Sequence, residues 1–369
     1  MRKEHKGKSR GFTLIELLIG STIMLVTILA ALYIYGRSNK VSVDQQQYAQ
    51  VQHDVRSGMY FITRDVRMAG CNLPGEFMGY FLDGVDNDTT DTQAAVRTDR
   101  LKMIGNDEDP LLLKIHGYQG SSVTVDLNDF SFEEYPYPDG FYDNKLALVL
   151  PNPSSGCRAG ELRWITHVTH SQPDTNEKLN FSPGLAPGIN PPGGLSGTCS
   201  QSSDYDGGAV VFANLIEYWL DVTGHYPGLT PGSNGYIGNG HGGILYKTEN
   251  GVHMPLALNV ENLQFEYNGD FNYATDPQHS LDGFQAWNST WTLEQVAQVR
   301  EIRVLVLGYT PNRMVSVSGT PPNNIFLYRR PAVANSPGAS QDDMRRRFLL
   351  ESTANIRNMS ANIYNTGER

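Results

Sequence analysis

The sequence predicts an α+β protein in which one long N-terminal helix packs on a large, β-rich and mainly antiparallel domain. Residues 12–35 form an almost unbroken apolar run, long enough for several helical turns. Between Tyr48 and Ala69, apolar side chains recur at steps of three and four, which is the spacing of one helical face. After Gly70 the chain changes to short runs of branched and aromatic residues separated by Gly, Pro, Asn and Asp, as in strands and turns.

Residues 1–11 have the composition of a basic leader peptide. They contain one acidic residue, Glu4, and five cationic residues: Arg2, Lys3, Lys6, Lys8 and Arg10. Basic segments beside a membrane span stay on the cytoplasmic side. We therefore expect the N-terminus in the cytoplasm and the rest of the chain beyond the apolar run in the periplasm.

Residues 12–36 are expected to form a membrane-spanning helix. The run from Phe12 to Tyr35 has one charged side chain, Glu16, and as a helix it would rise roughly 36 Å, against a hydrocarbon core of about 30 Å. The plausible cleavage point, between Gly11 and Phe12, precedes the apolar run, whereas a secretory signal peptide is cut after it. Cleavage would therefore remove the leader and keep the anchor.

Glu16 needs a partner, because a carboxylate in the apolar part of a membrane helix is costly and usually functional. Cleavage after Gly11 would create an amine at Phe12, one helical turn away in the same chain and available to a neighbouring chain. We expect this pair to act in assembly. The alternative is that the carboxylate only reaches back to the membrane surface.

The junction from Gly11 to Glu16, Gly-Phe-Thr-Leu-Ile-Glu, together with the basic leader and the apolar run, resembles the class III signal of type IV prepilins and type II secretion pseudopilins. The resemblance implies that a prepilin peptidase cleaves after Gly11 and N-methylates Phe12. It also implies that Glu16 serves assembly, and it implies no cofactor.

Residues 37–70 are expected to continue the helix as an amphipathic segment. Its apolar stripe consists of Tyr48, Val51, Val55, Met59, Ile62, Val66 and Ala69. Arg64 and Arg67 suit the negative end of the helix dipole, and Gly70 can adopt the left-handed conformation that ends a helix. One helix of about 58 residues results, with its first half facing lipid or other helices and its second half facing a sheet.

Residues 71–369 are expected to form a β-rich head. The strand candidates are Leu111–Ile115, Val123–Leu127, Leu146–Leu150, Leu162–Val168, Ala209–Val222, Leu263–Tyr267, Ile302–Tyr309 and Ile325–Tyr328, with a short helix at Thr292–Val299. Residues 171–208 and 224–243 are rich in Gly, Pro, Ser and Asn, so we expect long surface loops there.

Two segments resemble one subfamily, the PilW-like minor pilins of type IV pili. Residues 64–70 match its R-D-x-R-x-A-G pattern, and residues 345–358 resemble its C-terminal R-R-R … R-N strand. The resemblance implies a protein that primes or caps the pilus tip. Its partners would be other minor pilins, the major pilin, the inner-membrane assembly platform and the membrane, before the subunit moves to the fimbrium. A large pseudopilin of a type II secretion system and a pilus-tip adhesin are the alternatives.

The charge balance argues against nucleic acid as a ligand. The net charge is −10, and loss of the leader makes it −14, whereas phosphate binding needs clustered Lys and Arg. The chain has three cysteines. Outside the cytoplasm we expect a disulfide between Cys157 and Cys199, both in loop-rich segments, with pairing of Cys71 to either one as the alternative.

The sequence offers little for catalysis. It contains no G-x-S-x-G, P-loop, H-E-x-x-H or C-x-x-C pattern, so we expect no enzyme. Asp83, Asp86 and Asp88 belong to an acidic cluster in an expected loop, and such oxygen-rich loops can hold calcium. Their spacing does not match a known calcium loop, so a solvated turn is the preferred interpretation.

Overall fold

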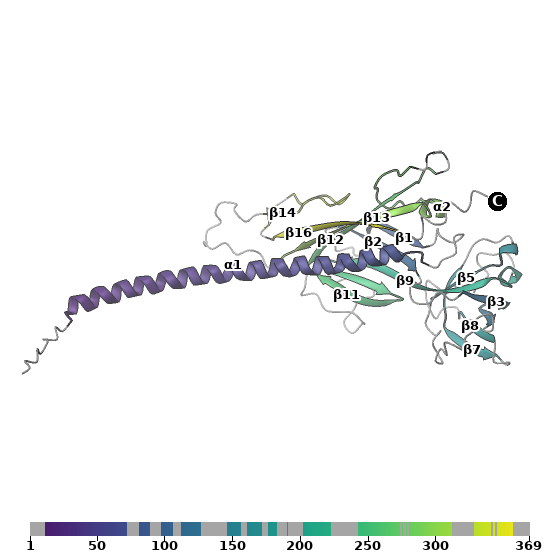
Figure 1. Ribbon diagram of the computed structural model, residues 1–369, viewed down its shortest axis with the longest axis horizontal. Coiled ribbons are helices and arrows are strands. Elements are labelled where there is room, and N and C mark those ends of the chain that lie inside the picture. Colours follow the sequence, from purple (N-terminus) through teal and green to yellow (C-terminus); the bar gives the residue numbers. More distant parts are fainter. Residues whose placement is uncertain are drawn as a thin grey trace, which may run out of the picture.

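The computed structural model describes residues 12–71, 81–88, 97–105, 112–126, 146–155, 161–171, 176–182, 190, 202–222, 243–273, 275, 278, 280–311, 328–340, 342–343 and 345–356. The helices are α1 (Leu14–Met68) and the short α2 (Leu293–Val296), with 3-10 turns at Pro153–Ser155 and Ser202–Tyr205. The chain is an α+β protein, as predicted, with one long helix and a β-rich head (Figure 1).

The strands form one large sheet and two small ones. The large sheet contains β1 (Leu82–Asp88), β2 (Thr98–Gly105), β3 (Leu112–Gln119), β4 (Ser122–Asp126), β5 (Leu146–Leu150), β6 (Glu161–Trp164), β7 (His167–Ser171), β8 (Asn176–Asn180), β9 (Ala209–Asp221), β10 (Ile244–Glu249) and β11 (Val252–Leu258). The second sheet has the order β12 (Val260–Gly269), β13 (Val299–Tyr309), β16 (Arg347–Asn355), and β14 (Tyr328–Arg329) pairs with β15 (Asp342–Asp343). All of these pairings are antiparallel.

The helix α1 has 55 residues and runs without interruption from the free apolar half into the head (Figure 1). Its end follows the predicted signal, because Gly70 adopts a left-handed conformation with φ 71°. The amide of Gly70 donates to the carbonyl of Ile104 at 2.8 Å, so the end of the helix is joined to β2.

One face of the second half of α1 is buried against the head. Val51, Val55, Ile62 and Val66 are at most 1% exposed and belong to the main hydrophobic core. Gly308 on β13 permits this contact, because a side chain there would come within 2.6 Å of a methyl group of Val55. The predicted amphipathic stripe is therefore the surface that attaches the helix to the sheets.

The strand β9 joins two parts of the head. Its first residues pair with β3 and β5, and its later residues pair with β2 and β10. Alternate side chains face different cores: Val211 and Ala213 belong to the core that contains α1, and Val210 and Phe212 belong to a second core. We call the part built on α1, β1, β2, β10–β13 and β16 the basal lobe, and the part built on β3–β8 the distal lobe.

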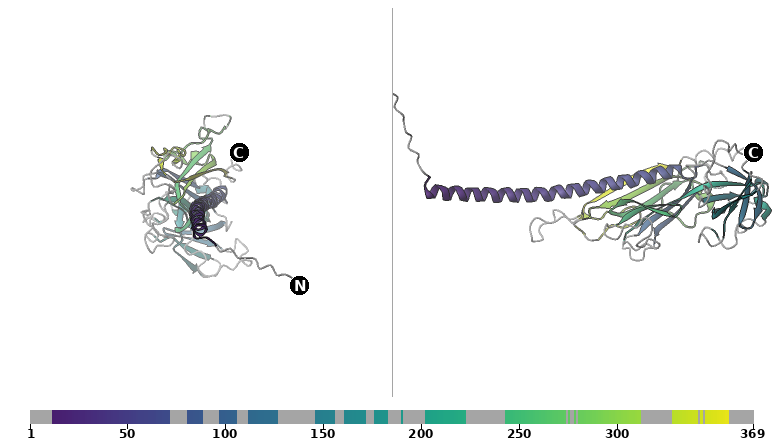
Figure 2. Two further views of the ribbon diagram at one scale, coloured as in Figure 1. Left: turned by 90° about the vertical axis from the view of Figure 1, so that its left-hand side faces the viewer. Right: turned by 90° about the horizontal axis from the view of Figure 1, so that it is seen from below.

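The distal lobe lies beyond the C-terminal end of α1, at the far end of the molecule from the free apolar half (Figures 1 and 2). Because β9 runs through both lobes as one strand, they are joined by sheet hydrogen bonds. The head therefore extends along the direction of the helix.

The structure differs from the predicted loop at residues 171–208. Residue 171 ends β7, residues 176–180 form β8, and residues 202–205 form a 3-10 turn. The strand β8 has one buried apolar side chain, Leu179, and it is held by pairing with β4 and β7. Pairing with distant partners overrides the weak local signal there. Of the other predicted loop, 224–243, only Gly243 is among the described residues.

Several predicted strands are present with shifted ends. The predicted strand Leu146–Leu150 matches β5, and Ala209–Val222 extends one residue beyond β9. The segment Leu162–Val168 is divided between β6 and β7, and β14 begins only at Tyr328, with residues 325–327 outside the described residues. The expected short helix before β13 is present as α2.

A buried polar cluster fixes α1 to the large sheet. Asp65 of α1 is 8% exposed, and its carboxylate accepts a hydrogen bond from the hydroxyl of Tyr218 at 2.6 Å. The same oxygen lies 2.9 Å from Nζ of Lys247, which also pairs with Glu249 at 2.9 Å. The helix carboxylate is thus satisfied by one residue of β9 and one of β10.

A second buried carboxylate connects the two larger sheets. Asp99 on β2 accepts hydrogen bonds from the amide of Asn87 at 3.0 Å and from the amide of Phe265 on β12 at 2.8 Å. Burial raises the pKa of Asp99 to about 7. The two amide bonds act in the opposite direction, and the nearby carboxylate of Asp86 adds to the rise.

We expect Tyr218→Phe to lower the free energy of unfolding by about 1.5 to 3 kcal/mol, because a hydrogen bond to a buried charge is lost. Tyr273→Phe is the matched control, since its hydroxyl donates to Glu294 at 2.8 Å on the surface; it should leave stability nearly unchanged. Denaturant unfolding of the detergent-solubilised chain measures both. Equal effects of the two substitutions would contradict a stabilising role for the Asp65 cluster.

We expect the stability of the wild type to fall as the pH rises from about 4 to about 7. An unfolded aspartate loses its proton near pH 4, whereas folded Asp99, with its raised pKa, keeps the proton to about pH 7. The folded state therefore binds more protons in this window, and Asp99→Asn should flatten the dependence. Thermal midpoints of both proteins at several pH values test this, and identical slopes would rule out a contribution from Asp99.

Candidate functional site

The first half of α1 is an exposed apolar helix. Its large side chains stand free of the head, with Leu14 82% and Tyr35 71% exposed. Among the described residues, α1 is the one helix long and apolar enough to cross a membrane, with a mean hydropathy of 2.4 over its most apolar window. A surface this apolar is unsuited to water and suits a membrane or a bundle of similar helices.

Three hydroxyl side chains in this half form hydrogen bonds within the helix. The hydroxyls of Ser21, Thr22 and Thr27 donate to backbone carbonyls three or four residues earlier, at 2.8 to 3.1 Å. No water is needed to satisfy these hydroxyls, which is the requirement for polar groups in an apolar surrounding.

The start of α1 is fixed by a reciprocal pair of residues. Thr13 is the N-cap, with extended backbone angles, and its hydroxyl accepts from the amide of Glu16 at 3.3 Å. The carboxylate of Glu16 accepts in turn from the amide of Thr13 at 3.0 Å and from its hydroxyl at 2.9 Å. This is a capping box, and it sets the first helical residue at Leu14.

The capping box leaves part of Glu16 available. Both bonds from Thr13 go to the same oxygen, Oε2, and Oε1 has no hydrogen bond to any residue that the structure describes. Phe12 lies just before the helix and is 87% exposed. The predicted amine at Phe12 and the free carboxylate oxygen would therefore both be accessible to a neighbouring chain. Gly11 lies outside the described residues.

Sequence reasoning missed Thr13. The pattern of a Thr followed three residues later by a Glu, placed directly before an apolar run, is a sequence signature of a helix start. Reading it would have placed the N-terminus of the helix at residue 14 and identified a local role for Glu16 beside the intersubunit one.

The acidic candidates Asp83, Asp86 and Asp88 lie on a strand, so the expected loop is wrong there. They belong to β1, an edge strand whose backbone pairs with β2. Asp88 forms an ion pair with Arg100 at 2.7 Å, and Asp86 accepts a hydrogen bond from Asn335 at 2.6 Å. Charged side chains on an edge strand also discourage pairing with foreign strands.

The described part of β1 and its surroundings do not assemble a metal site. No group of three or more His, Cys, Asp or Glu side chains within the described residues is placed to hold a metal ion. Asp86 and Asp88 have structural contacts instead: Asp86 binds Asn335, and Asp88 pairs with Arg100 of β2.

The cysteine predictions fall mostly outside the described residues. Cys157 and Cys199 are both outside, so their disulfide stays a prediction. Cys71 follows the end of α1, is half-buried and has a free thiol. Both possible partners of Cys71 lie outside the described residues, so its alternative pairing also stays a prediction.

The comparison with known families concerns the N-terminal segment. Residues 6–32 match the family model described as the prokaryotic N-terminal methylation motif, a span that includes Gly11, Phe12 and Glu16. No curated protein and no solved structure is significantly similar to the chain. The motif implies processing by a prepilin peptidase and assembly with pilins in a membrane system. Together with the exposed apolar helix, it supports a type IV pilin-like or pseudopilin protein.

Proposed function

We propose that this chain is a minor pilin of a type IV pilus that primes or caps assembly at the tip and is not an enzyme. The observation that carries the proposal is the junction at residues 11–16, where the methylation motif meets an exposed apolar helix. A helix of this kind, once freed of its basic leader, can leave the membrane for a bundle of similar helices without exposing apolar surface to water.

The shape of the head supports a tip position. The distal lobe continues past the end of α1, along the direction in which a filament of parallel helices would grow (Figure 1). A head extended in this way is difficult to repeat in every turn of a thin shaft, and it would occupy the space above its own helix. This favours a terminal position over a repeated one.

The contact proposed for assembly joins Glu16 of one subunit to the Phe12 amine of the next. The free oxygen of Glu16 and the exposed Phe12 make this contact possible without breaking the capping box. In an apolar bundle such an ion pair would set the axial offset between two helices, because the two groups of different subunits meet at one register.

A large pseudopilin of a type II secretion system is the second candidate, because the same motif serves both systems. Deletion of the gene distinguishes them: loss or shortening of surface pili supports the minor pilin, and a secretion defect with normal pili supports the pseudopilin. In either system the subunit would begin as a single-pass inner-membrane protein with its head in the periplasm.

We expect the mature protein to begin with N-methylated Phe12, because the apolar span starts there and the basic leader stays in the cytoplasm. Intact-mass analysis of the protein extracted from membranes measures this directly. Gly11→Val should make the uncut precursor accumulate. A wild-type protein that keeps residues 1–11 in cells that process other prepilins would contradict the cleavage site.

We expect Glu16→Gln to leave leader cleavage and membrane insertion intact and to reduce incorporation into sheared filaments by roughly tenfold or more, because the Phe12 amine loses its counter-charge. The carbonyl oxygen of the introduced amide can still accept from Thr13, so the helix start is preserved. Thr13→Ala is the converse control: it removes the capping hydroxyl and keeps the charge.

Immunoblots of filament and membrane fractions compare the two variants. Wild-type incorporation of Thr13→Ala together with loss of Glu16→Gln supports the ion pair. The opposite ranking would show that Glu16 acts through the start of its own helix.

A further inference from the structure

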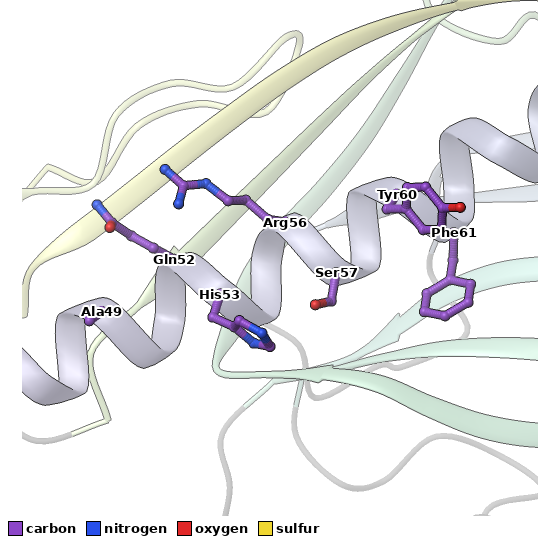
Figure 3. A pocket seen from close by; sticks show the side chains of 7 residues that line it. All are labelled: Ala49, Gln52, His53, Arg56, Ser57, Tyr60 and Phe61. Carbon is purple, nitrogen blue, oxygen red and sulfur yellow. The ribbon is translucent and has the colours of Figure 1, made fainter.

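The second half of α1 has an open face opposite the one packed on the head. Along it lie six residues that we call the outer stripe: His53, Arg56, Tyr60, Phe61, Arg64 and Arg67. Tyr60 is 64% and Phe61 is 37% exposed, and part of the stripe lines a shallow surface pocket made entirely of α1 residues (Figure 3). The end-on view shows α1 at the side of the head, with one flank uncovered (Figure 2).

The outer stripe is basic and aromatic in a chain that is acidic overall. It contains three arginines and one histidine, whereas the chain carries a net charge of −10. Of the two carboxylates in this helix segment, Asp54 accepts from Gln50 at 2.7 Å and lies 3.6 Å from the ring of His53. Asp65 is buried in its cluster with Tyr218. The charges of the arginines are therefore not balanced from within the helix.

Two arginines, Arg64 and Arg67, lie at the upper end of the stripe. Arg64 and Arg67 form no hydrogen bond or ion pair with any residue in the described part of the chain. Arg56 lies over the ring of Phe348, 5.6 Å from its centre, and the rings of Tyr60 and Phe61 meet edge to face at 5.7 Å. Exposed arginine and aromatic side chains of this kind carry most of the binding energy in protein interfaces.

Two other classes of partner fit the stripe poorly. Arg56 lies 21 positions after Tyr35, the end of the apolar run, which is roughly 30 Å along the helix and beyond the reach of lipid headgroups. Nucleic acid binding rests on many phosphate contacts from clustered Lys and Arg, and the stripe has three arginines within an acidic protein. A protein surface rich in carboxylates matches both the charge and the aromatic contacts.

We propose that the outer stripe docks an acidic face on the head of a neighbouring pilin-type subunit in the assembled filament. This inference rests on the proposed function. A Glu16 contact to the neighbour's Phe12 offsets two parallel subunits by four residues, or about 6 Å along the helix. Their heads then lie at nearly the same height, so the neighbour's head stands beside residues 53–67.

The partner's side of the contact should carry carboxylates spaced to match the arginines. Arg64 and Arg67 lie one turn apart, and Arg56 lies about 12 Å from Arg64 along the axis. Tyr60 and Phe61 lie between these charges, where they would exclude water from the ion pairs and strengthen them. The arginines of the stripe would thus favour an acidic subunit over a basic one.

Photo-crosslinking from the stripe identifies the occupant. The full chain with p-benzoylphenylalanine in place of Tyr60 is expressed in its own cells and irradiated, and the product is mapped by mass spectrometry. We expect a crosslink to a different prepilin-type subunit, within reach of Asp or Glu residues. A crosslink to a second copy of this chain, to lipid or to nucleic acid would overturn the proposal.

Charge reversal tests the chemistry of the contact. Arg64→Glu with Arg67→Glu should reduce both the crosslink and filament incorporation by about tenfold or more, with leader cleavage unchanged. Arg64→Lys with Arg67→Lys should keep most of both. The matched control is Lys114→Glu with Lys178→Glu, which makes the same change in net charge on β3 and β8 and should incorporate normally.

A rescue experiment separates loss of docking from loss of folding. Replacing the crosslinked carboxylates of the partner by Lys should restore incorporation of the charge-reversal variant, which a misfolded protein could not regain. Normal incorporation of the reversal variant, or no rescue, would overturn the docking surface. Absence of the wild-type protein from filaments would instead overturn the proposed function. The docking surface could still be tested in that case, because crosslinks from Tyr60 can be measured in the membrane fraction.

Discussion

The burial of one face of α1 by the head is the contact on which the rest of the molecule depends. A single helix has to be apolar all round in its first half and apolar on one side in its second half, because its two halves meet different surroundings. Val55 and Ile62 mark the buried side, and Gly308 lets β13 approach it closely. The described part of the basal lobe is positioned by this contact, and the distal lobe is attached to it through β9.

Two buried carboxylates make that arrangement specific. Apolar packing alone would allow α1 to slide or rotate over the sheets, since apolar contacts have little directionality. Asp65 removes this freedom, because it is buried and, among the described residues, has Tyr218 and Lys247 as its side-chain donors. Asp99 fixes the two larger sheets relative to each other, because its carboxylate accepts hydrogen bonds from the amides of Asn87 and Phe265. A shift of either element would leave a buried carboxylate without partners.

The sequence predicted those helices and strands whose own residues show a clear apolar run or periodicity. The long helix, its end near Gly70 and the strands β5, β9 and β13 all carry continuous patterns. The strands β1 and β8 do not, because their residues are mostly polar and are held by pairing with distant partners. The bond from Tyr218 to Asp65 spans 153 positions, so no local pattern could reveal it.

One part of the candidate functional surface could be predicted from the sequence and another part could not. The cleavage junction is a contiguous motif, so residues 11–16 were readable from the sequence, and Thr13 was overlooked although its pattern was present. The outer stripe was not readable. The same arginines fit the helix dipole equally well, and only the position of the head shows which face of α1 remains open.

The capping box connects the two proposed contacts. Thr13 and Glu16 fix the first residue of α1, and the helix then continues for 55 residues without a proline. A continuous helix of this kind has few places to bend. The height of the Glu16 carboxylate therefore determines the height of Arg64 and Arg67 relative to a neighbouring subunit. The ion pair between Glu16 and the neighbour's Phe12 would set the axial register of the two subunits. The outer stripe would then bind the neighbouring head that lies beside it if that head is acidic.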